Sequence, residues 1–356
     1  MDTLLLSGDR AAEAGALLEA GHLVVFPTET VYGLGADALN EDACKRIFEA
    51  KGRPQDNPLI VHIYERLQLG LLTVSLPPGA DSLMQAFWPG PLTLVLPKSA
   101  SVGSVVTAGL DTVGIRMPHH PVAREVLRSA GTPVAAPSAN RSGKPSPTTF
   151  AMACSAMTGR VAAIVDGGDC ENGLESTVLG WSQGHIQASA SCDEDPGSGW
   201  VILRPGSVTR EDLAHVLGPL LLPPVHPANE SLSVRSPGTR HPHYRPRSPV
   251  ALYYHYEDLK GEKSVLYRDW ALIGISDSLP FAESADDSMD REPEQWSGPV
   301  RLYPDWKELA RRLYSDFYEL DSLGVPGILV QIPKDDGGIG EALRNRAGKA
   351  AAGRFI

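Results

Sequence analysis

Short apolar runs alternate with helical patterns along the first 210 residues of the chain. Apolar residues at helical spacing predict helices over 11–21 and 41–51. Between them lie short runs rich in branched side chains and bounded by Gly or Pro, which is typical of buried strands. The predicted strands, in chain order, are LVVFPT, PLIVHI, LTLVLP, VGIRMP, PVAAPSA, AAIVDGG, STVLGW and WVILRPG. This pattern predicts a mixed α/β domain with a large sheet.

A second strand–helix alternation begins near Val250. The runs ALYYHY, ALIGIS, VRLYP and GILVQIP read as strands, and amphipathic patterns predict helices over 306–323 and 339–351. We therefore expect a smaller open parallel sheet after the first domain. The predicted division is a first domain over 1–217, an extended proline-rich linker over 218–248, and a second domain over 249–356.

Two further segments are polar and lack an apolar period. Residues 182–199 are rich in Gly and Ser and lie between two predicted strands, so they predict an extended surface hairpin. The acidic stretch over 283–294 predicts a mobile loop.

Composition narrows the function class. Hydrophobic residues make up 42% of the chain and charged residues 21%, as in ordinary soluble globular proteins. The formal net charge is −11, which argues against a protein that holds duplex nucleic acid over its whole surface, although a local basic groove stays compatible with it. No stretch has the roughly 20 apolar residues of a membrane span, and the N-terminus lacks the basic region of a signal peptide. We expect a cytoplasmic protein.

The cysteines do not indicate a metal site. The four, Cys44, Cys154, Cys170 and Cys192, are scattered and show no CxxC spacing. Reduced thiols are the expected state, and no zinc site is predicted.

The segment over 26–63 carries the first candidate chemistry. A predicted strand ends in Thr-Glu-Thr, a Gly-rich turn follows, and a helix then ends at Lys51-Gly52-Arg53. Two cations beside a glycine suit a polyphosphate, because Arg offers a bidentate fork, Lys a point charge, and Gly a close backbone approach. The alternative is that both cations complement the C-terminal end of the helix dipole.

Two common nucleotide-binding motifs are excluded. Gly33 and Gly35 lack the third glycine of the dinucleotide fingerprint, since Ala38 stands there and a helix does not follow directly. Gly143-Lys144 is followed by Pro145, so it is not a phosphate-binding P-loop. A nucleotide, if bound, is held in another way.

A second cluster of hydroxyl and amide side chains lies over 136–149. A predicted strand runs into Ser138-Ala139-Asn140, and a Ser/Gly/Pro loop then leads to a helix. Such groups can hydrogen-bond phosphate or ribose oxygens near a helix N-terminus. A capped turn without a ligand is the alternative.

Three polar fragments stand in apolar settings. They are Arg116, Ser176-Thr177 and Arg204. A buried Arg needs a partner. That partner is either an acidic side chain of the protein or a carboxylate or phosphate of a substrate.

Taken together and in order, these motifs resemble a known family. FPTETVYGLG, KGRPxxNPLIVHI, GIRMP, SANxSGKPSPT, ESTV and ILRPG are similar to the YrdC-type domain of threonylcarbamoyl-AMP synthases. The later SPGTRHPHYRP resembles the linker of the long, two-domain members, with Thr239, Arg240 and His241 where that linker usually has Met, Lys and an aromatic residue. The resemblance implies a twisted mixed α/β sheet followed by a Rossmann-like C-terminal domain.

The resemblance also implies roles for individual residues. Lys51 and Arg53 would be catalytic, with Lys51 near the phosphates. The implied ATP contacts are Arg53, Asn57, Ser138, Asn140, Ser146, Arg204 and Tyr244. The implied threonine contacts are Thr30, His62, Arg116, the backbone around Ala136, and Ser176. No metal ligand of the protein is implied, and Mg²⁺ is expected to enter on the triphosphate of ATP.

The activity that the resemblance implies is synthesis of threonylcarbamoyl-AMP from threonine, bicarbonate and ATP, for modification of tRNA next to the anticodon. The implied partners are the downstream transferase machinery and, at most, a weak contact with tRNA; no membrane is involved. The linker around His243 and Tyr244, with its several arginines, is expected to close over the nucleotide as a lid. The alternative is a double-stranded RNA or tRNA-binding protein that uses the same groove without catalysis.

Overall fold

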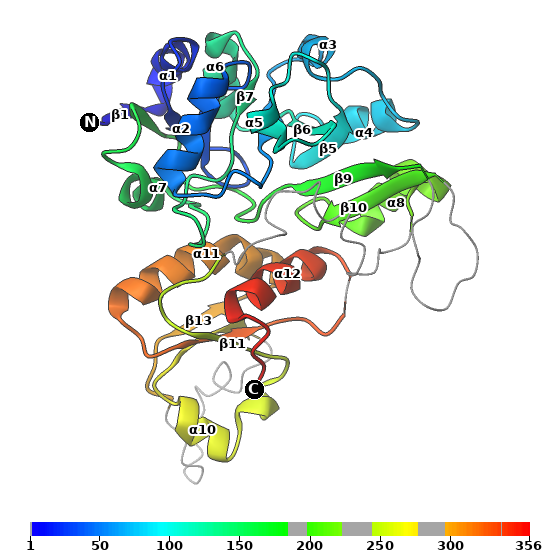
Figure 1. Cartoon of the computed structure of the whole chain (residues 1–356). Coiled ribbons are helices and arrows are strands. Elements are labelled where there is room, and N and C mark those ends of the chain that lie inside the picture. Colours follow the sequence, from blue (N-terminus) through cyan, green and yellow to red (C-terminus); the bar gives the residue numbers. More distant parts are fainter. Residues whose placement is uncertain (1, 184–197, 223–243, 277–295, 336) are drawn as a thin grey trace. The chain divides into compact units, whose positions relative to one another are not determined.

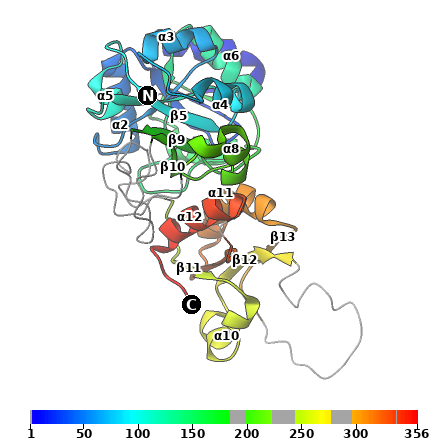
Figure 2. The same cartoon turned by 90° about the vertical axis from the view of Figure 1, so that its right-hand side faces the viewer.

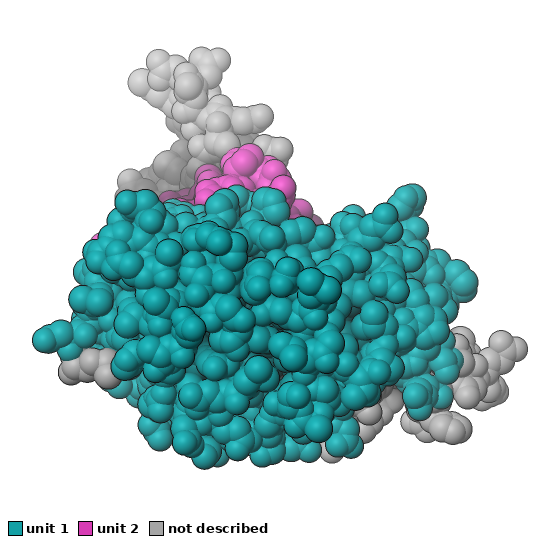
Figure 3. Space-filling model, turned by 90° about the horizontal axis from the view of Figure 1, so that it is seen from above, with its two compact units in different colours: residues 1–142, 146–241 teal, residues 143–145, 242–356 magenta. Residues whose placement is uncertain are grey.

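The computed structural model describes residues 2–183, 198–222, 244–276, 296–335 and 337–356. The chain divides into two compact units, coloured in Figure 3: unit 1 contains residues 1–142 and 146–241, and unit 2 contains residues 143–145 and 242–356. Most of the predicted hairpin over 182–199 and of the linker over 218–248, and all of the acidic stretch over 283–294, lie outside the described residues.

Unit 1 contains a ten-stranded mixed sheet in the order β1-β8-β2-β3-β7-β4-β6-β5-β9-β10. Its strands are β1 (Leu4–Ser7), β2 (Val24–Phe26), β3 (Gly33–Asp37), β4 (Ile60–His62), β5 (Leu92–Pro97), β6 (Thr112–Arg116), β7 (Val134–Ala135), β8 (Ala163–Asp166), β9 (Thr177–Ser182) and β10 (Gly199–Arg204). The predicted large mixed sheet is therefore confirmed, and β9 and β10 pair antiparallel on either side of the predicted hairpin.

Helices cover both faces of this sheet (Figures 1 and 2). The helices of unit 1 are α1 (Ala11–Glu19), α2 (Glu41–Lys51), α3 (Leu69–Leu72), α4 (Ala80–Phe87), α5 (Ser104–Thr107), α6 (Pro121–Ala130), α7 (Phe150–Met157) and α8 (Arg210–Leu217), with short 3-10 turns over Gly8–Arg10, Arg66–Gln68 and Gly218–Leu220. The apolar faces of α1 and α6 form one core with Val24 and Phe26. The apolar faces of α2, α4, α7 and α8 form a second core with Val25. Val25 belongs to a different core from Val24 and Phe26 because neighbouring residues of a strand point to opposite faces of the sheet.

Local signals explain why the helix over 41–51 was predicted with its observed bounds. The side chain of Asn40 accepts a hydrogen bond from the backbone N–H of Ala43 at 3.0 Å and caps the first turn. Gly52 ends the helix with a φ of 62°, a left-handed conformation that glycine adopts without a steric penalty. Lys51 and Arg53 are thereby fixed at the end of α2.

The Gly-rich turn predicted after Thr-Glu-Thr is wrong, because Gly33–Asp37 forms the buried strand β3 between β2 and β7. A Cβ built on Gly35 would lie 2.7 Å from Cε1 of Phe26 and 3.0 Å from Cγ1 of Val134. The glycine is therefore required by close packing across the sheet rather than by a turn.

Unit 2 contains an all-parallel four-stranded sheet, which confirms the predicted parallel sheet, and its strand order is β11-β14-β12-β13. Its elements are β11 (Val250–Tyr253), a 3-10 turn over Tyr256–Leu259, α10 (Glu262–Tyr267), β12 (Ala271–Ile275), β13 (Val300–Tyr303), α11 (Trp306–Leu323), β14 (Ile328–Gln331) and α12 (Ile339–Ala351). Figure 2 shows α11 and α12 side by side on one face of this sheet and α10 on the other. Within the described residues, no helix is both long and apolar enough to span a bilayer.

Candidate active site

The candidate site is built on a row of polar side chains that crosses five adjacent strands of the large sheet. The register places His62 of β4 beside Arg116 of β6, and Arg116 opposite Thr93 of β5. Thr93 pairs with Val178 of β9, which in turn pairs with Arg204 of β10. The four polar side chains are each at most 5% exposed. Because buried polar groups need partners, the contacts of this row decide what it can bind.

Arg116 is held by three groups. Its Nη2 lies 2.6 Å from Oε1 of Glu29, its Nη1 donates to Oγ1 of Thr30 at 2.8 Å, and its Nε donates to the carbonyl oxygen of Gly90 at 3.2 Å. Burial acts to raise the pKa of Glu29, but the charge and hydrogen bonding of Arg116 outweigh it and lower that pKa. The carboxyl group of Glu29 is therefore charged, and Glu29 is the acidic partner that the sequence left open for Arg116.

His62 is a neutral imidazole beside this ion pair. It is 4% exposed, and its Nδ1 has no hydrogen-bond partner among the described residues. Burial, reinforced by the positive charge of Arg116, lowers the pKa of His62 to about 3. The ring can therefore offer a lone pair to a polar group of a ligand at physiological pH.

Ser176 joins the row to Arg204. Its Oγ lies 2.8 Å from Oγ1 of Thr93 and accepts a hydrogen bond from Nη2 of Arg204 at 3.1 Å. Arg204 also donates from Nη2 and Nε to the carbonyl oxygen of Ser176, at 2.8 and 3.2 Å. The structure thus brings together Ser176 and Arg204, which the sequence assigned to different substrates.

Lys51 anchors the loop that follows β7. Its Nζ donates to the carbonyl oxygen of Ser138, and to the carbonyl oxygen and Oδ1 of Asn140 at 2.7 and 3.2 Å. Oγ of Ser138 donates to the same Oδ1 at 2.5 Å. Burial, followed by the charges of Arg53 and Arg141, lowers the pKa of Lys51 well below its usual value. Three oxygen acceptors nevertheless match the three N–H groups of an ammonium ion.

Arg53 and Asn57 close the basic side of the site. Nη2 of Arg53 donates to the carbonyl oxygens of Asn57 and Pro58, at 3.2 and 3.1 Å. Asn57 is 1% exposed, whereas Arg53 is half-buried. Lys51 is only 2% exposed, so Arg53 is the more accessible of the two cations at this end of α2.

A buried hydrogen bond links the two halves of the site. Oγ of Ser146 donates to Oε1 of Glu175 at 2.6 Å, and Glu175 directly precedes Ser176. The backbone N–H of Ala136 donates to the carbonyl oxygen of Ile60 at 2.9 Å, which ties the β7 end to β4. All the predicted site residues of unit 1 therefore belong to one connected region of that unit.

Tyr244 lies in unit 2. It is 4% exposed, its ring stacks on Tyr314 at 5.4 Å, and Arg346 and Lys349 lie over it at 5.4 and 6.0 Å from the ring centroid. Of the predicted linker over 218–248, residues 223–243 lie outside the described residues, and they include Arg235, Arg240 and His243. The contact between Tyr244 and ATP stays a prediction.

The acidic side chains of the site are already engaged. Glu29 pairs with Arg116, and Glu175 accepts from Ser146. Across the described part of the chain, no group of three or more His, Cys, Asp or Glu side chains has the arrangement of a metal site.

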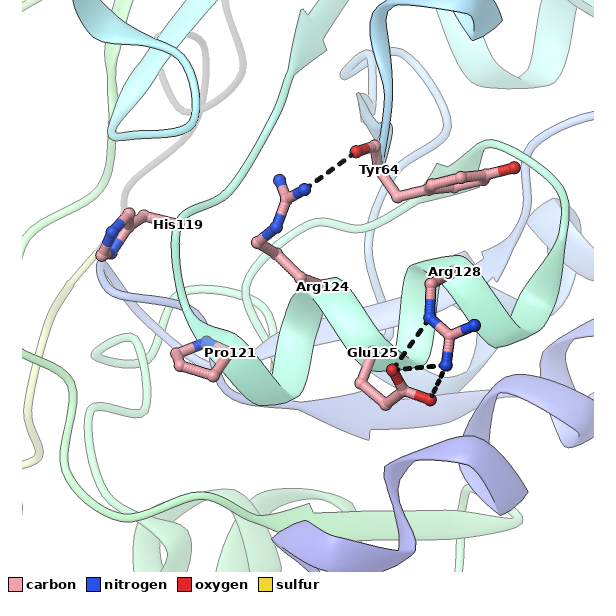
Figure 4. A pocket seen from close by; sticks show the side chains of 6 residues that line it. All are labelled: Tyr64, His119, Pro121, Arg124, Glu125 and Arg128. Atoms are coloured by element: carbon pink, nitrogen blue, oxygen red, sulfur yellow. Dashed lines mark hydrogen bonds and ion pairs between the residues drawn. The ribbon is translucent and has the colours of Figure 1, made fainter.

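A separate pocket lies beside α6, as Figure 4 shows. It has a volume of about 410 Å³ and is lined by Tyr64, His119, Pro121, Arg124, Glu125 and Arg128. Arg128 is paired with Glu125 at 2.6 Å, and Arg124 donates to the carbonyl oxygen of Tyr64 at 3.3 Å. None of the predicted site residues lines this pocket, and the charges of its lining residues largely cancel. No role is assigned to it.

The sequence alone indicated no role for Glu29, Thr93, Glu175 or Arg141. Glu29 and Glu175 stand next to the predicted contacts Thr30 and Ser176 within the motifs quoted above, so their position was a usable signal. Thr93 could be found only from the register of β5 with β6. Nη1 of Arg141 donates to the carbonyl oxygen of Ala50 at 2.6 Å, a contact between distant segments that no motif indicates.

Comparison with known proteins covers both units. Residues 16–189 match a family model described as telomere recombination, and residues 208–352 match the model of the C-terminal domain of threonylcarbamoyl-AMP synthase. A threonylcarbamoyl-AMP synthase of Bacillus subtilis is 41% identical over 361 residues, which cover 100% of this chain and 96% of that protein. A threonylcarbamoyl-AMP synthase of Pyrococcus abyssi is 39% identical to this chain, and the match covers 96% of this chain and 94% of that protein.

A solved structure agrees with these matches. The crystal structure of P. abyssi Sua5 complexed with L-threonine superposes with a TM-score of 0.81 at 36% identity, covering 100% of this chain and 99% of that one. Identity and coverage of this order, together with the two-unit fold, establish the family. The chain belongs to the threonylcarbamoyl-AMP synthases.

Proposed function

We propose that this chain makes L-threonylcarbamoyladenylate and pyrophosphate from L-threonine, bicarbonate or CO₂, and ATP. The observation that carries the proposal is the buried row of His62, Arg116, Thr93 and Arg204, which runs across five neighbouring strands of unit 1. A row of fixed donors and one neutral imidazole suits a small zwitterion next to a phosphate chain. Full-length relatives named for this synthesis, and a related structure with bound L-threonine, support it.

Threonine would be held on the side of the ion pair. Arg116 would receive the carboxylate, and the neutral His62 would accept from a polar group of the amino acid. Thr30, whose hydroxyl accepts from Arg116, Ser176, whose hydroxyl lies 2.8 Å from that of Thr93, and the backbone around Ala136 would complete the contacts.

ATP would be held on the basic side. Arg53 and Arg204 would contact the phosphates, with Asn57, Ser138, Asn140 and Ser146 as hydrogen-bonding groups. Lys51 would lie near the phosphates while it anchors Ser138 and Asn140. The predicted contact of Tyr244 with ATP is part of the same proposal.

The chemistry has two steps. The free amine of threonine attacks the carbon of CO₂, forms a C–N bond and releases a proton, which gives a carbamate. A carbamate oxygen then attacks the α-phosphorus of ATP, and the bond to pyrophosphate breaks. This reaction needs positioning and charge stabilisation more than a nucleophilic side chain. A site of Lys, Arg, Ser and Asn supplies both.

The proposal also covers the metal ion that accompanies ATP and the fate of the product. Mg²⁺ would accompany the triphosphate, bound mostly by phosphate and water oxygens. The labile product would pass to a tRNA threonylcarbamoyl transferase machinery in the cytoplasm, for modification next to the anticodon.

Pyrophosphate release tests the proposal. Purified full-length protein should release pyrophosphate from ATP only when threonine and bicarbonate are both present. The alternative, a non-catalytic RNA-binding protein, is disfavoured by the net charge of −11. It predicts retention of tRNA on a nitrocellulose filter without any threonine-dependent release.

A further inference from the structure

Glu29 is a buried carboxylate inside the candidate site to which no role has been given. Its side chain and that of Arg116 are each 4% exposed, and their closest atoms, Oε1 and Nη2, lie 2.6 Å apart. The other carboxylate oxygen, Oε2, accepts a hydrogen bond from the backbone N–H of His119 at 3.1 Å. Both oxygens of Glu29 are therefore engaged, and the carboxylate itself is fixed.

Stability alone does not explain such a pair. Removing two charges from water carries a desolvation penalty that often exceeds their mutual attraction, so apolar residues of similar volume frequently serve a core as well or better. A buried ion pair at the edge of a ligand site is more useful because it fixes the orientation of the charged side chain that meets the ligand. The guanidinium group is planar and presents its donors in a rigid fork.

The contacts of Arg116 leave some of its N–H donors without an acceptor among the described residues. The guanidinium group, including Nε, has five N–H donors. Among the described residues, Nε donates to the carbonyl oxygen of Gly90 and Nη1 donates to Oγ1 of Thr30, whereas Nη2 contacts Glu29 as an ion pair and has no hydrogen-bond acceptor. Nη1 makes one hydrogen bond and Nη2 makes none, so both terminal nitrogens keep N–H groups that a carboxylate could accept.

We propose that Glu29 is a positioning residue, which holds the guanidinium of Arg116 in the orientation that receives the carboxylate of threonine. This proposal rests on the proposed function. It also implies that Glu29 offsets the positive charge of Arg116. The site would then recognise the amino acid through the orientation of the N–H donors of Arg116 rather than through a net positive charge. A merely structural Glu29 would influence both substrates alike.

The first test is Glu29→Gln in the full-length protein, with steady-state kinetics for each substrate. The KM for threonine should rise at least about 10-fold, because a charge-assisted contact is misaligned. The KM for ATP and the kcat should stay within about 2-fold of wild type, since binding of threonine rather than catalysis is affected. Glu29→Asp, which keeps the charge on a shorter side chain, should recover part of the loss.

The matched control is Glu125→Gln. Glu125 forms an ion pair of the same 2.6 Å length with Arg128, but on the outer face of α6. Its loss should leave both KM values unchanged. An equal rise of both KM values in Glu29→Gln, or no rise for threonine, overturns the proposal.

A double-mutant cycle tests whether Glu29 acts through Arg116. Arg116→Gln alone should raise the KM for threonine, and adding Glu29→Gln should raise it no further, because residues that act as a unit are not additive. Effects that multiply in the double variant contradict the proposal. If Glu29→Gln does not fold, Glu29→Asp takes its place, with a several-fold rise expected for threonine alone.

The outcomes separate this proposal from the proposed function. Wild-type protein that forms no threonine-dependent product would refute the function itself. Active wild-type protein, with an unchanged threonine KM in the Glu29 variants, would refute only the positioning role.

Discussion

The ammonium group of Lys51 donates to both the backbone carbonyl and the side-chain oxygen of Asn140, which lies 89 residues further along the chain. With its third bond, to the carbonyl of Ser138, the lysine fastens the end of α2 to the loop after β7. The two cations that end α2 therefore have different tasks. Lys51 shapes the loop, whereas the half-buried Arg53 remains accessible to a ligand.

Lys51→Met should lower both activity and stability. Turnover is expected to fall at least about 10²-fold, as when a stabilising charge or its geometry is lost at an active site. The free energy of unfolding should fall as well, because buried oxygen acceptors that lose their donor cost about 1–3 kcal/mol each. Steady-state kinetics and urea unfolding give the two values. Wild-type stability in Lys51→Met would contradict the anchoring role.

Arg53→Ala should affect activity with much less effect on stability. We again expect turnover to fall at least about 10²-fold, through loss of charge stabilisation at the phosphates. Its two hydrogen bonds to backbone carbonyls are long and its side chain is half-buried, so unfolding should change by about 1 kcal/mol or less. Turnover close to wild type would show that Arg53 does not face the phosphates.

These contacts show what the sequence could and could not reveal. The helix over 41–51 was predictable because its cap, apolar face and terminal glycine lie within a few residues of one another. The acceptors of Lys51 are carbonyl groups on a loop 87 to 89 residues away, and no residue pattern encodes them. The pairing of Arg116 with Glu29 is equally remote in the chain, so the sequence left two kinds of partner open.

The error at β3 has a similar cause. Gly33 and Gly35 were predicted to form a turn, because glycine is most often needed where the backbone turns. In the fold, Gly35 is needed because the ring of Phe26 and the side chain of Val134 occupy the space of its missing side chain. That requirement arises from neighbouring strands and becomes visible only when the sheet is assembled.

His62 should make the stability of the protein sensitive to mild acid. Its pKa is about 3 in the folded chain against an ordinary value of 6.5, so below pH 6.5 the unfolded chain binds a proton that the folded chain does not. The free energy of unfolding should therefore fall as pH drops from 6.5 towards 3, by about 1.4 kcal/mol per pH unit.

The variant that serves for comparison is His62→Gln, and the free energy of unfolding in urea is measured for wild type and variant between pH 6.5 and 5. Glu29 is ionised in both states over most of that range, because its pKa is lowered in the folded chain and its ordinary value is 4.5. Wild type should lose about 2 kcal/mol more than the variant across the window. Parallel curves for the two proteins would mean that His62 is not held neutral.

Tyr244 should stabilise unit 2 through its ring. The residue has a φ of 68°, and the ring packs on Tyr314 beneath the cations of Arg346 and Lys349. Tyr244→Ala should lower the free energy of unfolding by about 3–5 kcal/mol, as expected when a buried aromatic side chain is truncated.

Tyr244→Phe is the matched control, because it keeps the ring and its stacking. Hydrogen exchange of α11 and α12 in the full-length protein reports the effect on this unit alone. Exchange should accelerate in Tyr244→Ala and change little in Tyr244→Phe. Equal acceleration in both variants would indicate that the hydroxyl group, rather than the ring, carries the interaction.

The central claim is the synthesis of threonylcarbamoyl-AMP, and incorporation of radiolabelled bicarbonate tests it most directly. The purified protein is incubated with labelled bicarbonate, threonine, ATP and Mg²⁺, and the nucleotides are separated. We predict a labelled adenylate that forms only with threonine present, in step with pyrophosphate release, and that is at least about 10²-fold slower in Arg53→Ala. Absence of label from the adenylate, or label that appears equally without threonine, would contradict the account.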